Sequence, residues 1–278
     1  MDDVDPVDEL PISVVGEWAL EKHARLRKYI DIYRAVRRQF TDPSRASAYR
    51  GGATYIDLFC GPGRAKVRET GLLIDGSPLV AVKSAIAGKY PFSEIHLADL
   101  NPAYCEAAVK RVGVLGCNVK GHVGQAEQTT VQIMAELNPH GLHFAFLDPF
   151  NLEDLSFETI AKLSTLKHID LLLHVSVQDL QRNFARYEAD DPSALDAFAP
   201  GWRAHVSRKQ SMNAIRADIL KHWQGLVRGL GFLEPRGAEL VTGSAKQRLY
   251  WLFFLSKNQI ANDFWDKIRN ISGQRDLL

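Results

Sequence analysis

The sequence predicts an α/β domain built on an open, mostly parallel sheet of seven strands. Short apolar runs alternate with segments of helical periodicity over residues 54–177, which is typical of repeated strand–helix–strand units. Residues 231–256 differ, because two strand-like pieces are joined there by a turn-rich linker, G-S-A-K-Q at 243–247. This pair predicts an antiparallel hairpin at the end of the otherwise parallel sheet.

The individual elements follow from the periodicity of the apolar residues. Apolar runs predict parallel strands at 54–60, 94–100, 118–123, 143–148 and 169–177. Helical spacing predicts helices at 77–88, 102–113, 128–137 and 157–163. Ser77 followed by Pro78 is a typical helix start, with Ser77 as the expected N-cap. The residues before it, 64–76, are expected to form a loop or a small hairpin.

Two further segments lie outside this alternation. Apolar residues at helical spacing predict an N-terminal helix over 17–40. Its other face carries six basic side chains: Lys22, Arg25, Lys28, Arg34, Arg37 and Arg38. That face is either solvated or a surface for an acidic partner or an RNA backbone. Residues 178–230 are too many for a simple crossover and predict a partly helical insertion beside the substrate pocket.

The composition is that of an ordinary soluble globular chain, with 46% apolar and 24% charged residues. We expect one domain over 17–278, preceded by a flexible acidic segment at 1–16 that has little to bury. The net charge of +1 creates no overall attraction to nucleic acid. No apolar stretch is long enough for a membrane span, and the acidic start is unlike a signal peptide.

The cysteines and histidines do not predict a metal site. Cys60, Cys105 and Cys117 form no C-x-x-C pair and have no histidine nearby at ligand spacing. So few cysteines suit the reducing cytosol, and a cytoplasmic protein is expected. Cys60 and Cys105 are interpreted as small buried fillers, and His143 and His174 as core histidines.

The first strand ends in a glycine turn that predicts a ligand-binding loop. Asp57 lies near the end of the strand, and Gly61 and Gly63 follow, so that the backbone can approach a ligand with no Cβ in the way. Lys66 stands where a dinucleotide-binding G-x-G-x-x-G motif would have its third glycine. Asp57 is expected to hold the amides of this loop or to bind the ammonium group of a ligand.

Polar residues also follow the next strands, and open parallel sheets bind ligands at these carboxyl ends. Asp99 is expected to accept hydrogen bonds from two ribose hydroxyls, and Gln125 to pair with a purine edge. A glycine turn, an acid for ribose and an amide for adenine suit S-adenosylmethionine, which has no phosphates to cradle. Neighbouring residues complete the expected cofactor-binding set: Phe59, Ser77, Leu100 and Ala126.

Five motifs together resemble the three-Cys-motif partner protein family. They are H-A-R-L-R-K-Y at 23–29, Y-I-D-L-F-C-G-P-G at 55–63, D-G-S-P-L-V-A at 75–81, A-D-L-N at 98–101 and F-L-D-P-F-N at 146–151. The resemblance covers most of the chain. It implies a Rossmann-like class I S-adenosylmethionine-dependent methyltransferase fold and a companion protein that bears a three-cysteine motif. The family often has Ala at Cys60 and Gly at Asn151.

The D-P-F-N motif at 148–151 is also similar to the D-P-F-G loop of tRNA guanine-N2 dimethyltransferases. An amine acceptor needs its N–H groups held by oxygens so that its lone pair faces the methyl group. Asp148 and the Pro149 carbonyl are expected to accept those hydrogen bonds. Phe150 is expected to stack on a planar base, and Asn151 to add a polar contact.

These residues favour an enzyme that uses S-adenosylmethionine to methylate an amino group on a base of RNA or DNA. Two alternatives stay open. The near-neutral charge suits a small-molecule or protein amine as the acceptor, since nucleic-acid-binding proteins usually carry a basic face. The resemblance to a partner family also suits a non-catalytic scaffold for the three-cysteine-motif protein.

Overall fold

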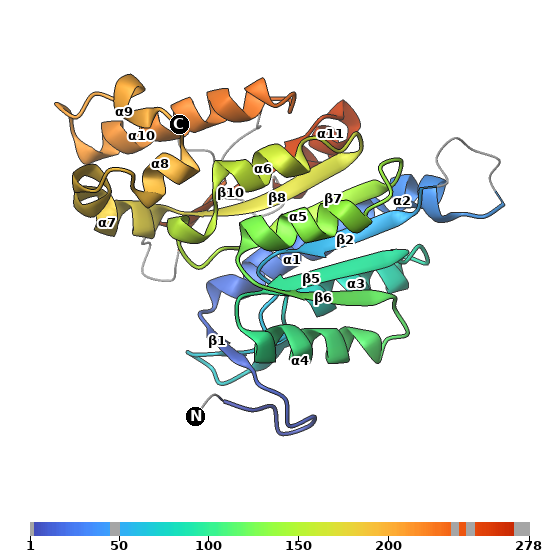
Figure 1. Ribbon diagram of the computed structural model, residues 1–278. Helices are drawn as coiled ribbons and strands as arrows, with labels where there is room; N and C mark the ends of the chain where they lie inside the picture. Colours follow the sequence, from blue (N-terminus) through green and yellow to red (C-terminus); the bar gives the residue numbers. More distant parts are fainter. Residues whose placement is uncertain (1–2, 45–50, 235–238, 243–247, 270–278) are drawn as a thin grey trace.

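The computed structural model describes residues 3–44, 51–234, 239–242 and 248–269. These residues form a seven-stranded sheet at the centre of the molecule, with helices on both faces (Figure 1). Its strands are β2 (Ala53–Asp57), β5 (Glu94–Asp99), β6 (Val119–Val123), β7 (Leu142–Leu147), β8 (Ile169–Ser176), β9 (Glu239–Thr242) and β10 (Arg248–Ser256). Their order across the sheet is β6-β5-β2-β7-β8-β10-β9.

This strand order confirms the predicted Rossmann-like fold. The first five strands run parallel, and the chain builds outward from β2 through β5 to β6 before it places β7 on the other side of β2. β10 is antiparallel to both β8 and β9, which confirms the terminal antiparallel pair. Its predicted turn at 243–247 lies outside the described residues. The strand order reverses at β2 and β7, where open α/β sheets bind ligands.

Two apolar cores lie on opposite faces of the sheet. One face is covered by α1 (Trp18–Ile32), α2 (Arg34–Thr41), α3 (Ser77–Ala87), α4 (Pro102–Gly113) and α11 (Gln259–Arg269). The other is covered by α5 (Ala126–Glu136) and α6 (Phe157–Leu163). β2 shows the division, because Tyr55 packs into the first core and Ile56 into the second. The strand is buried throughout, as its continuous apolar run predicts.

The residues predicted as an insertion, 178–230, fold into four helices: α7 (Val177–Ala189), α8 (Ala194–Phe198), α9 (Trp202–His205) and α10 (Met212–Gly229). Their apolar side chains extend the core on the α5–α6 face, where Trp223 stacks on Phe198 and packs against Phe253 of β10. α8 contacts η1 (Leu152–Asp154), a short 3-10 helix that follows the D-P-F-N motif. The insertion therefore lies beside the end of β7.

The N-terminal helix differs from its prediction in two ways. The single helix expected over 17–40 is two helices, because α1 ends at Ile32 and α2 begins at Arg34, with Tyr33 as the cap residue between them. The six basic side chains also do not share one solvated face. Lys22, Arg25 and Arg37 are buried, whereas the other three are exposed. Arg37, for example, donates to the backbone carbonyl of Ile30.

The N-terminal residues require a second correction. The sequence predicts a flexible segment at 1–16, but β1 (Ser13–Val15) pairs in parallel with β3 (Arg64–Val67). β3 in turn pairs with β4 (Leu73–Asp75) in the antiparallel sense. Of the loop or small hairpin expected at residues 64–76, the structure therefore has the hairpin. Acidic side chains at the start of the chain form ion pairs with arginines. Strand pairing and ion pairs therefore hold residues 3–15 against the domain, although few of these residues are apolar.

Candidate active site

Three carboxylates meet at one edge of the sheet. Asp57 ends β2, Asp99 ends β5, and Asp148 directly follows β7. β5 and β7 flank β2 and run parallel to it, so these three ends are adjacent. The structure therefore brings the residues at these three strand ends together. The partners of the three carboxylates differ, which gives each a different chemical environment.

The turn after β2 contains two glycines in the left-handed region. Gly61 has φ +55° and Gly63 has φ +82°, which other residues adopt only with strain. A Cβ on Gly61 would meet no atom within 4 Å, so this side of the turn is open. A Cβ on Gly63 would lie 3.3 Å from the Ala108 Cα on α4. A ligand can therefore approach the backbone at Gly61, whereas Gly63 is required for packing.

Asp99 holds this glycine turn in place. Its Oδ2 accepts a 2.9 Å hydrogen bond from the Gly61 N–H, and its Oδ1 accepts a 2.8 Å bond from the Asn101 N–H. Burial raises the pKa of Asp99, although these amide bonds oppose the rise. Each carboxylate oxygen can accept a further hydrogen bond, so Asp99 retains capacity for ribose hydroxyls.

The ends of β5 and β6 lie together beside this carboxylate. The Gly124 N–H donates to the Asp99 carbonyl at 3.1 Å, which brings Gln125 to the same edge. Gln125 is exposed, and its side chain does not cap α5. Leu100 is 67% exposed, whereas Ala126 is buried in the core. The structure thus groups Asp99, Leu100 and Gln125 around one open rim.

Asp57 lies beneath the glycine turn. Its fully buried carboxylate accepts hydrogen bonds from the Tyr55 hydroxyl at 2.9 Å and from the Phe59 N–H at 3.3 Å. Burial raises the pKa of Asp57 to about 7, even though the Ser77 hydroxyl also donates to it. Ser77 is therefore not the N-cap that the sequence predicts, because Gly76 occupies that position. Asp57 therefore holds an amide of the loop, which is one of the two roles expected for it.

Asp148 is neutralised by side chains from other elements. Lys22 Nζ of α1 forms an ion pair with its Oδ2, and His174 Nδ1 of β8 lies 2.8 Å from its Oδ1. Burial alone would raise the pKa of Asp148. The charge of Lys22 and the hydrogen bond to His174 outweigh it and hold this pKa well below its usual range. Burial also lowers the pKa of His174, which keeps that imidazole neutral.

Sequence patterns do not identify Lys22 and His174 as residues of this site. They assign Lys22 to a basic helix face and His174 to the core. One signal points to Lys22, since it follows Trp18 and precedes Leu26 by four residues each and so shares their apolar face. The Trp18 ring lies 4.5 Å from Lys22 Nζ and 6.1 Å from the His174 ring, measured to ring centroids. Trp18 therefore covers the ion pair.

The rest of the D-P-F-N motif is divided between core and solvent. Pro149 is buried. Asn151 Oδ1 accepts a 3.2 Å bond from the Asp154 N–H and so caps η1. Phe150 is 92% exposed. Both carboxylate oxygens of Asp148 already have protein partners, whereas Phe150 presents its ring to solvent.

The cysteine and histidine side chains outside this edge of the sheet do not form a further candidate site among the described residues. Within the described ranges, no group of three or more His, Cys, Asp and Glu residues could hold a metal ion. Cys60 and Cys105 are buried thiols, and His143 Nε2 lies 3.0 Å from the Asn138 carbonyl oxygen. No helix in the described part of the chain combines the length and apolar character needed to cross a membrane.

Comparisons with known proteins give distant structural matches. No protein-family profile and no curated protein matches the sequence. The N-methyltransferase NodS from Bradyrhizobium japonicum, in complex with S-adenosyl-L-homocysteine, shares 11% identity at a TM-score of 0.43, covering 87% of this chain and 88% of its own. Trm1 from Pyrococcus horikoshii, in complex with S-adenosyl-L-methionine, shares 10% identity at 0.43, covering 92% and 58%.

A third solved structure is similar over a smaller part of its length. The DszA carbon methyltransferase shares 11% identity at a TM-score of 0.42, and the match covers 76% of this chain. This chain spans about half of DszA, 48% of its length. Similarity at these levels supports no conclusion about the activity or the substrate of this chain.

We expect Asp57 to make stability depend on pH between about pH 4 and pH 7. Its pKa is about 7 in the folded protein against 3.8 ordinarily, so the folded state binds this proton more tightly than the unfolded state does. The free energy of unfolding should therefore fall with rising pH in the wild type relative to Asp57→Asn. Urea unfolding of both proteins at about pH 5 and pH 8 measures this difference. If the free energies of unfolding of the two proteins differ by the same amount at both pH values, this prediction is wrong.

Lys22→Met should lower the free energy of unfolding by about 3 kcal/mol, because it leaves the half-buried Asp148 carboxylate without its charged partner. Adding Asp148→Asn to the same chain should recover most of that loss. Denaturant unfolding of the single and double variants gives the coupling energy. Lys28→Met is the matched control, since Lys28 is exposed on the same helix, and should change stability by less than about 0.5 kcal/mol. Additive losses would show that Lys22 and Asp148 do not stabilise each other.

Proposed function

We propose that this chain is an S-adenosylmethionine-dependent methyltransferase. The observation that carries the proposal is the hydrogen bond between Gly61 and Asp99, which fixes an open turn beside an acid with spare acceptor capacity. This pair lies at the carboxyl ends of β2 and β5, next to the point where the strand order reverses. A cofactor made of an amino acid, a ribose and an adenine requires such a turn and such an acid side by side.

The glycine turn is poorly suited to a dinucleotide. In pyrophosphate sites, the N-terminus of a helix follows the glycine loop directly and binds the phosphates. Here the β3–β4 hairpin intervenes, and Ser77 in the first turn of α3 is hydrogen-bonded to the buried Asp57. The hydroxyl in the first turn of α3 is therefore bound by a protein carboxyl group and is not free for a phosphate. S-adenosylmethionine has no phosphate and avoids this conflict.

Each part of the cofactor has a counterpart at this edge. Gly61 would face the methionine part, Asp99 the ribose hydroxyls and Gln125 the adenine edge. Leu100 offers an exposed apolar side chain to the adenine ring. The other residues that the sequence predicts for this site are Asp57, Phe59, Gly63, Ser77 and Ala126, of which Asp57, Ser77 and Ala126 are buried. The bound cofactor would supply an electrophilic methyl group.

Cofactor binding can be measured directly by titration calorimetry with S-adenosyl-L-homocysteine. Asp99→Ala should raise the Kd at least tenfold, because hydrogen bonds to a charged group contribute about 1.5–3 kcal/mol. Gly61→Val should abolish binding, since it strains the turn and fills its open side. Asp263→Ala, on the exposed surface of α11, is the control and should leave the Kd unchanged. A wild-type protein that binds no ligand at about millimolar concentration would refute the proposal.

We further propose that the acceptor is an amino group on a nucleic-acid base. The exposed Phe150 ring supports this, because aromatic side chains at such sites stack on unpaired bases. The amine would then replace Lys22 as the hydrogen-bond donor to Asp148. His174 would keep the Asp148 carboxylate oriented during this exchange, since it contacts the second oxygen.

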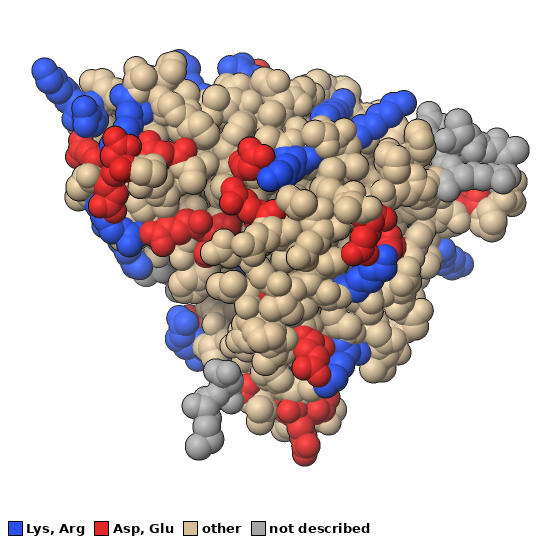
Figure 2. All heavy atoms as spheres, viewed as in Figure 1, with Lys and Arg blue, Asp and Glu red and all other residues tan. Residues whose placement is uncertain are grey.

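Two observations favour other functions for the same fold. Figure 2 shows acidic and basic side chains intermixed over one face, with no continuous basic surface. This distribution favours a small-molecule or protein amine as the acceptor. The ion pair between Lys22 and Asp148 favours a non-catalytic scaffold for a three-cysteine-motif protein, because it occupies the oxygen that an amine would need.

Methyl transfer from labelled S-adenosylmethionine separates these functions. We expect label in RNA, its loss in Asp148→Ala, and its retention in Glu158→Ala, an exposed control on α6. RNA affinity should fall steeply with salt, with a slope of about −0.7 per phosphate contacted on a single strand. Label in protein or small molecules, with a flat salt dependence, would support the second acceptor class. Cofactor binding without transfer to any acceptor would support the scaffold.

A further inference from the structure

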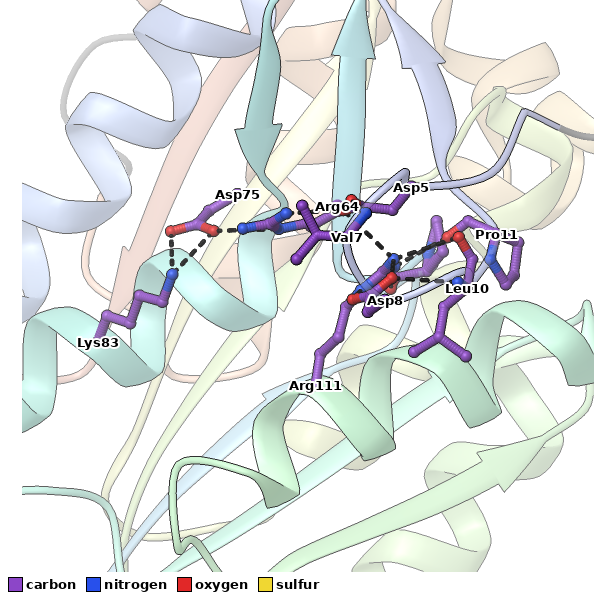
Figure 3. A network of polar contacts seen from close by, with 10 residues as sticks. Asp5, Val7, Asp8, Leu10, Pro11, Arg64, Asp75, Lys83 and Arg111 are labelled. Atoms are coloured by element: carbon purple, nitrogen blue, oxygen red, sulfur yellow. Dashed lines mark hydrogen bonds and ion pairs between the residues drawn. The ribbon is translucent and has the colours of Figure 1, made fainter.

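Two arginines flank the glycine turn, and both are bound by acidic residues of the N-terminal segment (residues 3–15). Figure 3 shows this network, in which Arg64 belongs to β3 and Arg111 projects from α4. Asp5 and Asp8 supply the carboxylates. Asp8 and Arg111 are 103 residues apart in the sequence, so this contact ties two distant segments together at the site.

Arg111 is the centre of this network. Its Nε and Nη2 donate to the two oxygens of Asp8 at 2.8 Å and 2.7 Å, which is a bidentate pair. Its Nη1 donates to the Pro11 carbonyl at 2.8 Å and to the Pro62 carbonyl at 2.6 Å. Pro62 is the middle residue of the glycine turn. One buried guanidinium therefore binds both the N-terminal segment and the turn.

Asp5 adds a second link at the other end of the turn. Its Oδ2 accepts a 2.7 Å hydrogen bond from Arg64 Nη1 and lies 3.7 Å from Arg111 Nη2. Arg64 directly follows Gly63, and it also begins the strand that pairs with β1. Asp5 is completely buried, so this ion pair is shielded from solvent on the carboxylate side. The segment thus holds the turn at Pro62 through Arg111 and at Arg64 through Asp5.

We propose that the N-terminal segment positions the glycine turn for the cofactor, and that Arg111 transmits this effect. The inference rests on the proposed function. Glycines restrict the backbone little, and Asp99 holds the turn only at the Gly61 N–H, so the rest of the turn needs further contacts to fix it. Arg111 fixes the carbonyl of the next residue, Pro62, and Asp8 fixes the plane of the guanidinium through its paired bonds. Arg111 is a positioning residue, because it reaches the cofactor only through the turn.

The packing of α4 does not depend on the Arg111 side chain. Ala107, Ala108 and Val112 of the same helix are buried and anchor it to the core. Loss of the Asp8 carboxylate would leave Arg111 with carbonyl oxygens and with Asp5, whose Oδ2 lies 3.7 Å from Nη2, and none of these replaces the bidentate pair. The expected result is a looser turn on an unchanged helix.

Asp8→Asn tests this inference, and Asp3→Asn is its matched control. Asp3 belongs to the same segment and pairs with Lys66 at 3.2 Å, where both side chains are exposed. Asp8→Asn should raise the Kd for S-adenosyl-L-homocysteine about tenfold by calorimetry. Asp3→Asn should leave that Kd within about twofold of the wild type. Without ligand, hydrogen exchange at residues 58–63 should be faster in Asp8→Asn and unchanged over α4.

Arg111→Lys provides a second variant if Asp8→Asn does not fold. It keeps the charge but loses the planar fork, so the same rise in Kd and the same faster exchange are expected. Folded variants with unchanged affinity and unchanged exchange would overturn the inference. A wild-type protein that binds no S-adenosyl-L-homocysteine would instead overturn the proposed function. In that case, unchanged exchange in the variants would still reject the positioning of the turn.

Discussion

Three carboxylates end adjacent strands at one edge of the sheet, and each must be stabilised there in its own way. Burial and nearby like charges both disfavour an ionised carboxylate. Asp57 has a raised pKa and binds the Ser77 hydroxyl at the start of α3. Asp99 accepts a hydrogen bond from the glycine turn, and Asp148 forms an ion pair with Lys22 of α1. A different element therefore stabilises each carboxyl group. Charge therefore sets the arrangement of this edge as much as apolar burial does.

The sheet and the cofactor side of the site were predictable because local patterns determine them. Continuous apolar runs indicate strands that are buried on both faces, and parallel strands end at a common edge. Asp99 and Gly61 could therefore be expected as neighbours, and the structure joins them by a hydrogen bond. Ser77 shows the limit of this reasoning. Its type and position favour a cap, but the nearby carboxyl group of Asp57 binds the hydroxyl instead.

The acceptor side and the N-terminal segment were not predictable, because they depend on contacts between distant residues. Lys22 and Asp148 are 126 positions apart, and a charged residue gives no indication of its partner. The same holds for Asp8 and Arg111. An acidic segment with few apolar residues is predicted to be flexible, because the sequence does not show that its carboxylates meet arginines from distant segments. Periodicity can place Lys22 on an apolar face, but only the tertiary fold shows which carboxylate neutralises it there.

The position of β10 has a consequence for how the chain is synthesised. This strand lies between β8 and β9, so β9 cannot join the sheet before β10 exists, whereas β8 can pair with β7 but has no partner on its other side. β8 is mostly apolar and is buried in the finished fold, yet it leaves the ribosome before the whole helical insertion and β10. During that interval it is an uncovered edge strand, the kind that pairs with other chains. The edge of β8 therefore stays open to pairing with other chains until β10 is made, although every residue of the proposed cofactor site precedes β8 in the chain.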